Sequence, residues 1–402
     1  MDTNKRLTCN SVHDVLNCDD ILQEILLRLP PSSICKFIIT SKRWLRVICS
    51  SSFYRCYVNR WGQKFRLLGF FVCNFLYLGR PRDGYQRPSW EPALPFLSTC
   101  KEGDDLKSSG VLKKLGYFID CSHGILLCGR HPKTYYVYNF KNKQQCSLPE
   151  PQQFYKMLCM AFIVEEYIDD AICYKVIRAK CECKLKVRNT VSIETFSSQT
   201  GTWKQSTLTC STTFALRPRT VAMVVKGVVH WFAMWGNLAI YDPRFGDRRI
   251  ALVKLPAGGL SHEHEESVLG ESSDGLLQYG QSSNLGVEIW VLENEEGANS
   301  STYRNCAHVR KKWILRWRLN FKVMWKQNPS LSMQCKESQI LSFLPQNSQS
   351  IFIRSGWNIF QCDLETRTVE IIYYQGRGAA ISWESSKVVP YFLPAWPLAC
   401  VS

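Results

Sequence analysis

The stretch LNCDDILQEILLRLP, residues 16–30, predicts the first element of the fold. Its apolar residues recur with the spacing of one helix face, and they are Ile21, Leu22, Ile25, Leu26 and Leu29. Asp19 or Asp20 can cap the helix N-terminus, because a carboxylate accepts unpaired backbone N–H groups there. Pro30 and Pro31 end the helix, because proline lacks an N–H donor and disfavours helical dihedrals in the preceding residue.

Two shorter helices are expected to follow. Ser32 or Ser33 can cap a helix that carries Ile34, Phe37 and Ile38, and Thr40 or Ser41 can cap another that carries Trp44, Leu45 and Ile48. The three helices form a module over residues 14–60, and residues 1–13 precede it as a flexible N-terminus. A module of about forty residues buries little apolar surface without metal, disulfides or a partner. Because no metal motif is present, we expect part of its apolar surface to bind a partner.

From about residue 65 the helical periodicity disappears and the sequence becomes β-like. Runs rich in β-branched and aromatic residues alternate with Gly, Pro, Asn, Asp and Ser turns. One order recurs over residues 124–149 and 227–256: strand, turn, strand ending in Asn or Asp, and strand entering Leu-Pro. Antiparallel ribbons that repeat every ~40–50 residues are typical of propeller blades, and ring closure removes exposed strand edges.

The predicted fold class is therefore α+β multidomain. The small three-helix module is followed, over residues 65–402, by a mainly antiparallel β domain. Dividing the length of this domain by the period of a blade predicts a β-propeller of about six to eight blades.

The composition is that of a globular protein without a targeting segment. The 402 residues are 45% hydrophobic and 21% charged. The polar N-terminus has no signal-peptide pattern, and no stretch reaches the ~18 apolar residues of a transmembrane helix. Nineteen cysteines occur without Cys-x-x-Cys spacing. We therefore expect a reducing compartment, cytoplasm or nucleus, and neither structural zinc nor a membrane partner.

The net charge of +16 is concentrated in a few stretches. Between Arg304 and Lys326 there are eight Lys or Arg residues and no acidic residue. Such a stretch can contact nucleic acid, an acidic protein or anionic lipid. It can also be a solvated β ribbon whose charges protect strand edges, which is the interpretation we favour.

Catalytic motifs are missing from the sequence. It contains neither a Gly-rich phosphate loop nor the Gly-x-Ser-x-Gly of hydrolases. The HEHEE sequence at residues 262–266 lacks the spacing of a helical zinc site and lies between glycines, so it is interpreted as an acidic loop. His230 falls in a strand pattern and is expected to be a core or hydrogen-bonded histidine. We therefore expect no cofactor, no metal and no catalytic activity.

Residues 16–53 resemble the F-box. The matching pieces are Leu16, DDIL at 19–22, EIL at 24–26, RLP at 28–30, SKRW at 41–44 and Phe53. In the family, the first leucine is followed by proline, and this Leu-Pro pair is part of the adaptor contact. Here the proline is replaced by Asn17. The resemblance implies a surface for a Skp-type adaptor made by Leu16, Ile21, Ile25, Leu26, Leu29, Pro30 and Ile34. Trp44 is expected in the core instead.

The β region resembles the F-box-associated, kelch-like propeller domain of plant F-box proteins. Matching pieces are LGFF at 68–71, ETFSSQTGTW at 194–203, the pair at 230–231 and PAWPL at 394–398. Only one of the Gly-Gly pairs typical of kelch blades occurs, at 258–259.

Together, the resemblances imply a non-catalytic substrate-recognition subunit of a Skp–cullin–F-box ubiquitin ligase. The adaptor links the chain to a cullin–RING ligase, and the β domain captures an unknown target protein for ubiquitination. Two alternatives stay open. One is a propeller that binds nucleic acid or another ligand, and the other is a propeller enzyme with acidic or His residues in its central channel.

Overall fold

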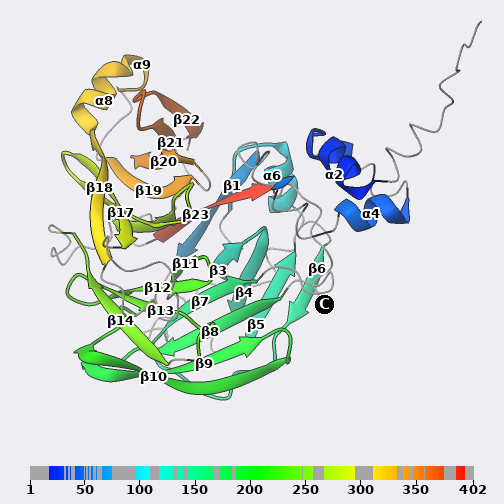
Figure 1. The fold of residues 1–402 in the computed structure, drawn as a ribbon. Helices are drawn as coiled ribbons and strands as arrows, with labels where there is room; N and C mark the ends of the chain where they lie inside the picture. Colours follow the sequence, from blue (N-terminus) through cyan, green and yellow to red (C-terminus); the bar gives the residue numbers. More distant parts are fainter. Residues whose placement is uncertain are drawn as a thin grey trace, which may run out of the picture. The chain divides into compact units, whose positions relative to one another are not determined.

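The computed structural model describes residues 18–30, 33–34, 37, 41–48, 50, 53, 56–57, 60, 66–74, 96–108, 117–130, 134–139, 143–165, 173–182, 187–218, 220–246, 248–256, 267–294, 311–332, 338–344, 347–356, 358–374 and 386–393 (Figure 1). The chain divides into two compact units. One comprises residues 1–66, 166–172 and 393–402, and the other residues 67–165 and 173–392. The predicted flexible N-terminus, residues 1–13, lies outside the described residues, and the predicted domain boundaries stay predictions.

The first unit contains the helical module, with α2 (Asp19–Leu27), α4 (Lys42–Ile48) and helical residues at 33–34 and 37. One side of each helix enters a common core. The core residues are Leu22, Leu26, Leu27, Ile34, Val47, Ile48, Phe53 and Tyr57. Burying these side chains, each worth roughly 1.5–3 kcal/mol when fully removed from water, holds the short helices together.

The two helix starts differ in how they are capped. The prediction that Asp19 or Asp20 caps α2 was wrong, because the N-cap is Cys18 in extended backbone with no side-chain cap bond. Asp19 instead pairs with Arg43 of α4, with 2.7 Å between Oδ1 and Nη2. The expected cap by Ser41 is confirmed, since its Oγ accepts the N–H of Trp44 at 3.2 Å.

The second unit is built from antiparallel strands in blades, which we number in chain order. Blade 1 contains β3 (Tyr117–Ser122), β4 (Ile125–Arg130), β5 (Thr134–Asn139) and β6 (Gln144–Ser147). Blade 2 contains β7 (Leu158–Val164), β8 (Tyr174–Lys180), β9 (Arg188–Ser197) and β10 (Thr202–Phe214). Blade 3 contains β11 (Met223–Val225), β12 (Val228–Ala233), β13 (Asn237–Tyr241) and β14 (Arg249–Lys254).

The remaining strands form three further blades. Blade 4 contains β15 (Ser267–Glu271), β16 (Leu277–Ser283), β17 (Gly286–Asn294) and β18 (Lys311–Asn320). Blade 5 contains β19 (Ser338–Leu344), β20 (Asn347–Ser355), β21 (Asn358–Asp363) and β22 (Val369–Tyr373). Blade 6 combines both ends of the domain, in the order β2 (Phe96–Ser98), β1 (Arg66–Asn74), β23 (Ser386–Leu393).

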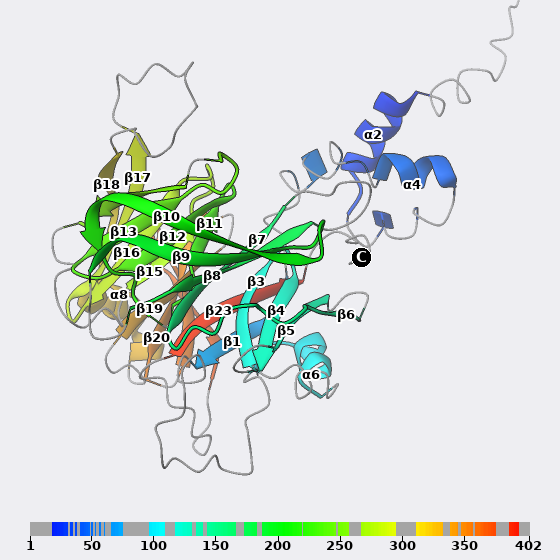
Figure 2. The same cartoon turned by 90° about the horizontal axis from the view of Figure 1, so that it is seen from below.

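Contacts between neighbouring blades close a ring. Blades 2 and 3 form one 8-stranded sheet, because β10 and β14 pair in parallel. Apolar clusters join blade 3 to 4, blade 4 to 5 and blade 5 to 6. Phe71 of β1 stacks on Phe118 of β3, with ring centroids 4.6 Å apart, and so joins blade 6 to blade 1. Figure 2 shows the strands β1 and β3 of these two blades close together. The predicted β-propeller is thus confirmed, and the described strands form six blades.

Among the described residues, three short helices interrupt the β region, where the sequence pattern indicated none. They are α6 (Lys101–Ser108), α8 (Phe321–Gln327) and α9 (Pro329–Ser332). Strand β18 ends at Asn320, and Phe321 begins α8 directly after it. Asn320 is its N-cap, with Oδ1 accepting the N–H of Val323 at 3.1 Å. A helix of two turns is too short for periodicity to reveal, but the capping asparagine was a usable signal.

Candidate functional site

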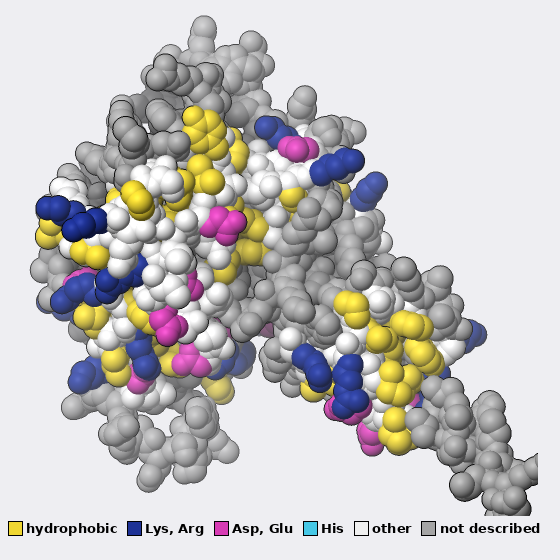
Figure 3. Space-filling view, turned by 90° about the horizontal axis from the view of Figure 1, so that it is seen from above, with side chains coloured by type: hydrophobic (Ala, Val, Ile, Leu, Met, Phe, Trp, Pro, Cys, Tyr) yellow, Lys and Arg dark blue, Asp and Glu magenta, His cyan; other side chains and the backbone are white. Residues whose placement is uncertain are grey.

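One face of α2 leaves two isoleucines uncovered. Ile21 and Ile25 are 41% and 39% exposed, whereas Leu22 and Leu26, on the adjacent face about 100° further round the helix, are fully buried. Residues four apart lie on the same helix face, so Ile21 and Ile25 form one apolar strip. Figure 3 shows hydrophobic side chains gathered on the surface of this module. The helix therefore has one face for its own core and another available to a partner.

The remaining predicted adaptor contacts differ in burial. Leu26 and Ile34 are fully buried, so within the module they support the surface from beneath and do not form it. Pro30 is exposed and Leu29 is half-buried. Leu16 lies outside the described residues. The adaptor contact itself stays a prediction, but its outward part consists of Ile21, Ile25 and Pro30.

Two features of the helical module were missing from the sequence-based prediction. Leu45 of α4 is 40% exposed, although its pattern indicated a core position. Tyr57 is buried, and its hydroxyl donates to Leu29 O at 2.6 Å, which fixes the chain just after α2. Trp44 is half-buried against the core with its ring centroid 5.0 Å from that of Phe37, as expected for a core residue.

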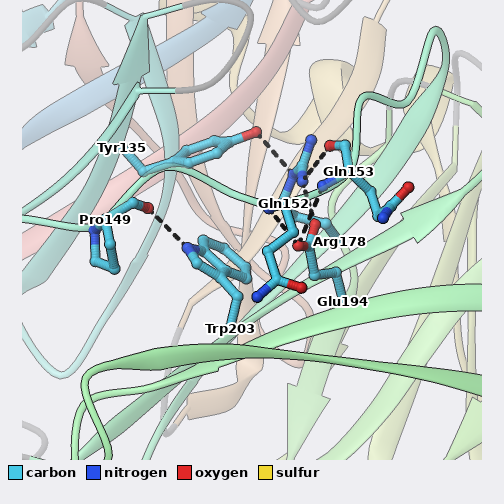
Figure 4. Close-up of polar contacts among 7 residues, drawn as sticks. All are labelled: Tyr135, Pro149, Gln152, Gln153, Arg178, Glu194 and Trp203. Atoms are coloured by element: carbon cyan, nitrogen blue, oxygen red, sulfur yellow. Dashed lines mark hydrogen bonds and ion pairs between the residues drawn. The ribbon is translucent and has the colours of Figure 1, made fainter.

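The interface between blades 1 and 2 contains a buried ion pair (Figure 4). Arg178 of β8 and Glu194 of β9 are 1% and 0% exposed, with 2.5 Å between Nη1 and Oε2. Arg178 also donates to the Tyr135 hydroxyl at 3.2 Å and to Gln153 O at 3.0 Å. Glu194 Oε1 accepts the backbone N–H groups of Gln152 at 2.6 Å and Gln153 at 3.3 Å. The pair therefore fixes the connection between β6 and β7.

Two tryptophans make the same contact at different blade interfaces. Trp203 Nε1 of β10 donates to Pro149 O at 2.7 Å, and Trp313 Nε1 of β18 donates to Lys254 O at 2.9 Å. Each acceptor lies where the preceding blade ends in Leu-Pro. The Leu-Pro that recurs in the sequence thus marks the backbone segment that the next blade's outer strand binds.

Comparison with known proteins assigns both units. A family model described as "F-box domain" matches residues 18–56, and one described as "F-box protein At3g26010-like, beta-propeller" matches residues 106–372. The chain belongs to this family of F-box propeller proteins. It is 44% identical to "F-box protein At5g03970" of Arabidopsis thaliana over 96% of this chain and 90% of that one. It is 23% identical to "Putative F-box protein At1g47390" of the same plant, over 72% of each.

The basic stretch of the propeller is partly neutralised by its own sheet. Arg318 of β18 pairs with Glu288 of β17, with 2.6 Å between Nη2 and Oε1. Arg316 of β18 pairs with Glu293 of β17. Opposite charges facing each other across two strands stabilise the pairing. The residues at 304–310 lie outside the described part of the chain. Within β18, the interpretation as a solvated β ribbon accounts for both arginines without nucleic acid.

His230 of β12 is the buried histidine that the strand pattern predicted. It is 4% exposed, with Nδ1 3.2 Å from Met223 O, and burial lowers its pKa to about 4. The imidazole is therefore neutral near pH 7, and Nδ1 donates its proton to the carbonyl oxygen. No described residues form a group of three His, Cys, Asp or Glu side chains able to hold a metal ion. The 262–266 sequence is not among them.

The helices of the described part of the chain are all short. None has the length and apolar character needed to cross a membrane.

Proposed function

We propose that this F-box propeller protein is the substrate-recognition subunit of a Skp–cullin–F-box ubiquitin ligase. Its F-box docks onto a Skp-type adaptor, and the adaptor binds a cullin–RING ligase. Its propeller captures a target protein for ubiquitination. The family membership of both units supports this role. We also propose that the propeller is kelch-like.

The exposed strip of Ile21 and Ile25 is the observation that carries the proposal. An isoleucine gains roughly 1.5–3 kcal/mol when it moves from water into an apolar interface. The inner face of the same helix is already fully used by Leu22 and Leu26. A module this small therefore gains most of its further apolar burial from a partner.

In this role the chain neither makes nor breaks a covalent bond. It holds the target near the transferring enzyme, so tethering and orientation raise the effective concentration of the reacting groups. We propose that it is a non-catalytic receptor and that it acts in the cytoplasm or nucleus. The cysteines within the described residues are free thiols, as suits a reducing compartment.

A pull-down of the full chain with a purified Skp-type adaptor tests the proposal. The variant Ile21→Asp with Ile25→Asp places two charges in the exposed strip, and we expect it to lose adaptor binding by at least about a hundredfold. Leu285→Asp is the matched control, because it makes the same chemical change at an exposed propeller turn. Unchanged melting curves show that both variants are folded. An adaptor that binds the double variant as well as the natural chain contradicts the proposal.

A further inference from the structure

The two ends of the propeller differ in the side chains that they expose. One end carries the turns between the first and second strands of the blades, and in blades 3, 4 and 5 these turns contact each other. Lys226 Nζ donates to Asp274 O at 3.2 Å, joining blades 3 and 4. Ser273 N donates to Ser348 Oγ at 2.7 Å, joining blades 4 and 5. We name this end, defined by Lys226, Ser273, Asp274 and Ser348, the polar face.

The opposite end carries the turns between second and third strands and the connections between blades. Eight large hydrophobic side chains of the described propeller residues are exposed. Six belong to this end, which we name the apolar face: Phe154, Val187, Trp235, Leu285, Val323 and Tyr374. The other two, Leu315 and Ile371, lie in outer strands. Exposed apolar side chains gathered at one end of a domain are typical of an interaction surface.

The best-defined part of the apolar face lies where the β16–β17 turn meets α8. Leu285 is 76% exposed, and its carbonyl oxygen accepts the N–H of Phe321 at 3.0 Å. The next residue, Gly286, lies so near β18 that a Cβ atom would be 1.9 Å from Leu319 O. The turn is therefore held rigidly, with Leu285 outward and Val323 of α8 two residues beyond its anchor.

Basic side chains accompany these apolar residues. Lys322 and Lys326 are exposed one turn apart on α8, and Lys156 is exposed near Phe154. Within the described residues, no ion pair is formed by these three lysines. The acidic residues in the described connections of this face are Glu150, Glu182 and, in α6, Glu102, Asp104 and Asp105. Glu182 already lies 3.4 Å and 3.8 Å from two basic neighbours, and α8 itself carries no acidic residue. At α8 the apolar face thus has positive charge available to a partner.

We infer that the apolar face binds an acidic segment of the target protein that also carries hydrophobic side chains. The hydrophobic side chains cover Leu285 and Val323, and carboxylates reach Lys322 and Lys326. A nucleic acid has matching charge, but its backbone offers no apolar groups to cover the two aliphatic side chains. The inference rests on the proposed receptor function, since it names the surface and the chemistry of the captured target.

Fluorescence anisotropy with the full chain and three labelled peptides tests the inference. The parent peptide alternates Glu with Leu and Phe, the second has Lys in place of Glu, and the third has Ser in place of Leu and Phe. We expect only the parent to bind well. Lys322→Glu with Lys326→Glu should weaken it about tenfold at low salt. Leu285→Ser with Val323→Ser should weaken it by about tenfold or more.

The control variant is Lys143→Glu with Lys204→Glu. It reverses two exposed lysines in the β5–β6 turn and in β10, away from the apolar face, and should bind the parent peptide like the natural chain. Three results overturn the inference. They are no measurable binding of the parent peptide, equal binding of it by the natural chain and by the Lys322→Glu, Lys326→Glu variant, or tighter binding of the Lys peptide than of the parent peptide. Displacement of the parent by a short single-stranded RNA that binds more tightly also overturns it, in favour of nucleic acid.

A second comparison separates this inference from the proposed function. The Ile21→Asp, Ile25→Asp variant should lose the adaptor but bind the parent peptide unchanged. If the natural chain binds the peptide but no adaptor, the ligase role fails and the apolar face stands. If it binds the adaptor but no peptide, the apolar face is wrong and the ligase role stands.

Discussion

The F-box and the propeller each contain an ion pair that joins two elements, but the two pairs lie in opposite surroundings. Asp19 and Arg43 join α2 to α4 with side chains 65% and 32% exposed. Arg178 and Glu194 are almost fully buried, and they make further hydrogen bonds to the β6–β7 connection and to Tyr135 of β5. Water competes for the first pair and is excluded from the second. Similar contacts should therefore contribute very differently to stability.

The largest effect is expected from Glu194→Gln. This variant leaves the Arg178 guanidinium buried without a countercharge, which typically costs about 3–5 kcal/mol. Urea unfolding followed by propeller tryptophan fluorescence measures the loss. Arg178→Met with Glu194→Met is the control, since replacing both charges together should restore much of the stability. A loss below about 1 kcal/mol for Glu194→Gln would place this pair in the same class as the exposed one.

Leu26→Ala should come next, and it acts on the helical module. Leu26 is fully buried in the F-box core, and truncating such a leucine costs about 2–5 kcal/mol. We expect helical ellipticity to be lost at lower urea concentration while the propeller transition stays in place. Ile25→Ala on the exposed face is the matched control and should leave unfolding nearly unchanged. Equal losses for both variants would mean that the two sides of α2 do not differ as described.

Because His230 is buried in the propeller, we predict that acid destabilises the propeller more than the F-box. Burial holds the pKa of this imidazole at about 4, below its ordinary value of 6.5. As pH falls from 6.5 to 4, the unfolded chain takes up a proton that the folded chain does not, so stability decreases by up to about 3 kcal/mol. Urea unfolding at pH 7 and pH 5 measures this. His230→Gln should make the propeller's pH dependence shallower, and an unchanged slope would count against the buried neutral imidazole.

The smallest effect is expected from Asp19→Asn. An exposed pair contributes about 0–1 kcal/mol, and salt screens it. Thermal unfolding of the F-box in low and high salt should show a small loss that disappears as salt rises. A loss as large as that of Glu194→Gln would remove the contrast between the two pairs.

Local patterns made much of the architecture predictable. The apolar spacing after Asp20 indicated α2, Ser41 indicated the start of α4, and Leu-Pro marked blade ends that tryptophans bind. Caps and short helices were less accessible. Cys18 caps α2 by backbone conformation alone, and α8 is only seven residues long, too short for a periodic signal. The candidate surface was predicted as a set of residues, without the division between inner and outer positions.

The sequence by itself determined the type of most elements and the order in which they occur, because periodicity, turns and caps act within a few residues. The tertiary structure decided which apolar residues of α2 face outward, since Leu26 is buried in one core cluster with Ile34, Phe53 and Tyr57. It also decided that β1 and β23 share a blade and that Arg178 meets Tyr135, 43 positions away. Burial and charge pairing depend on segments distant in sequence, and only the folded helical module and the closed ring bring those segments together.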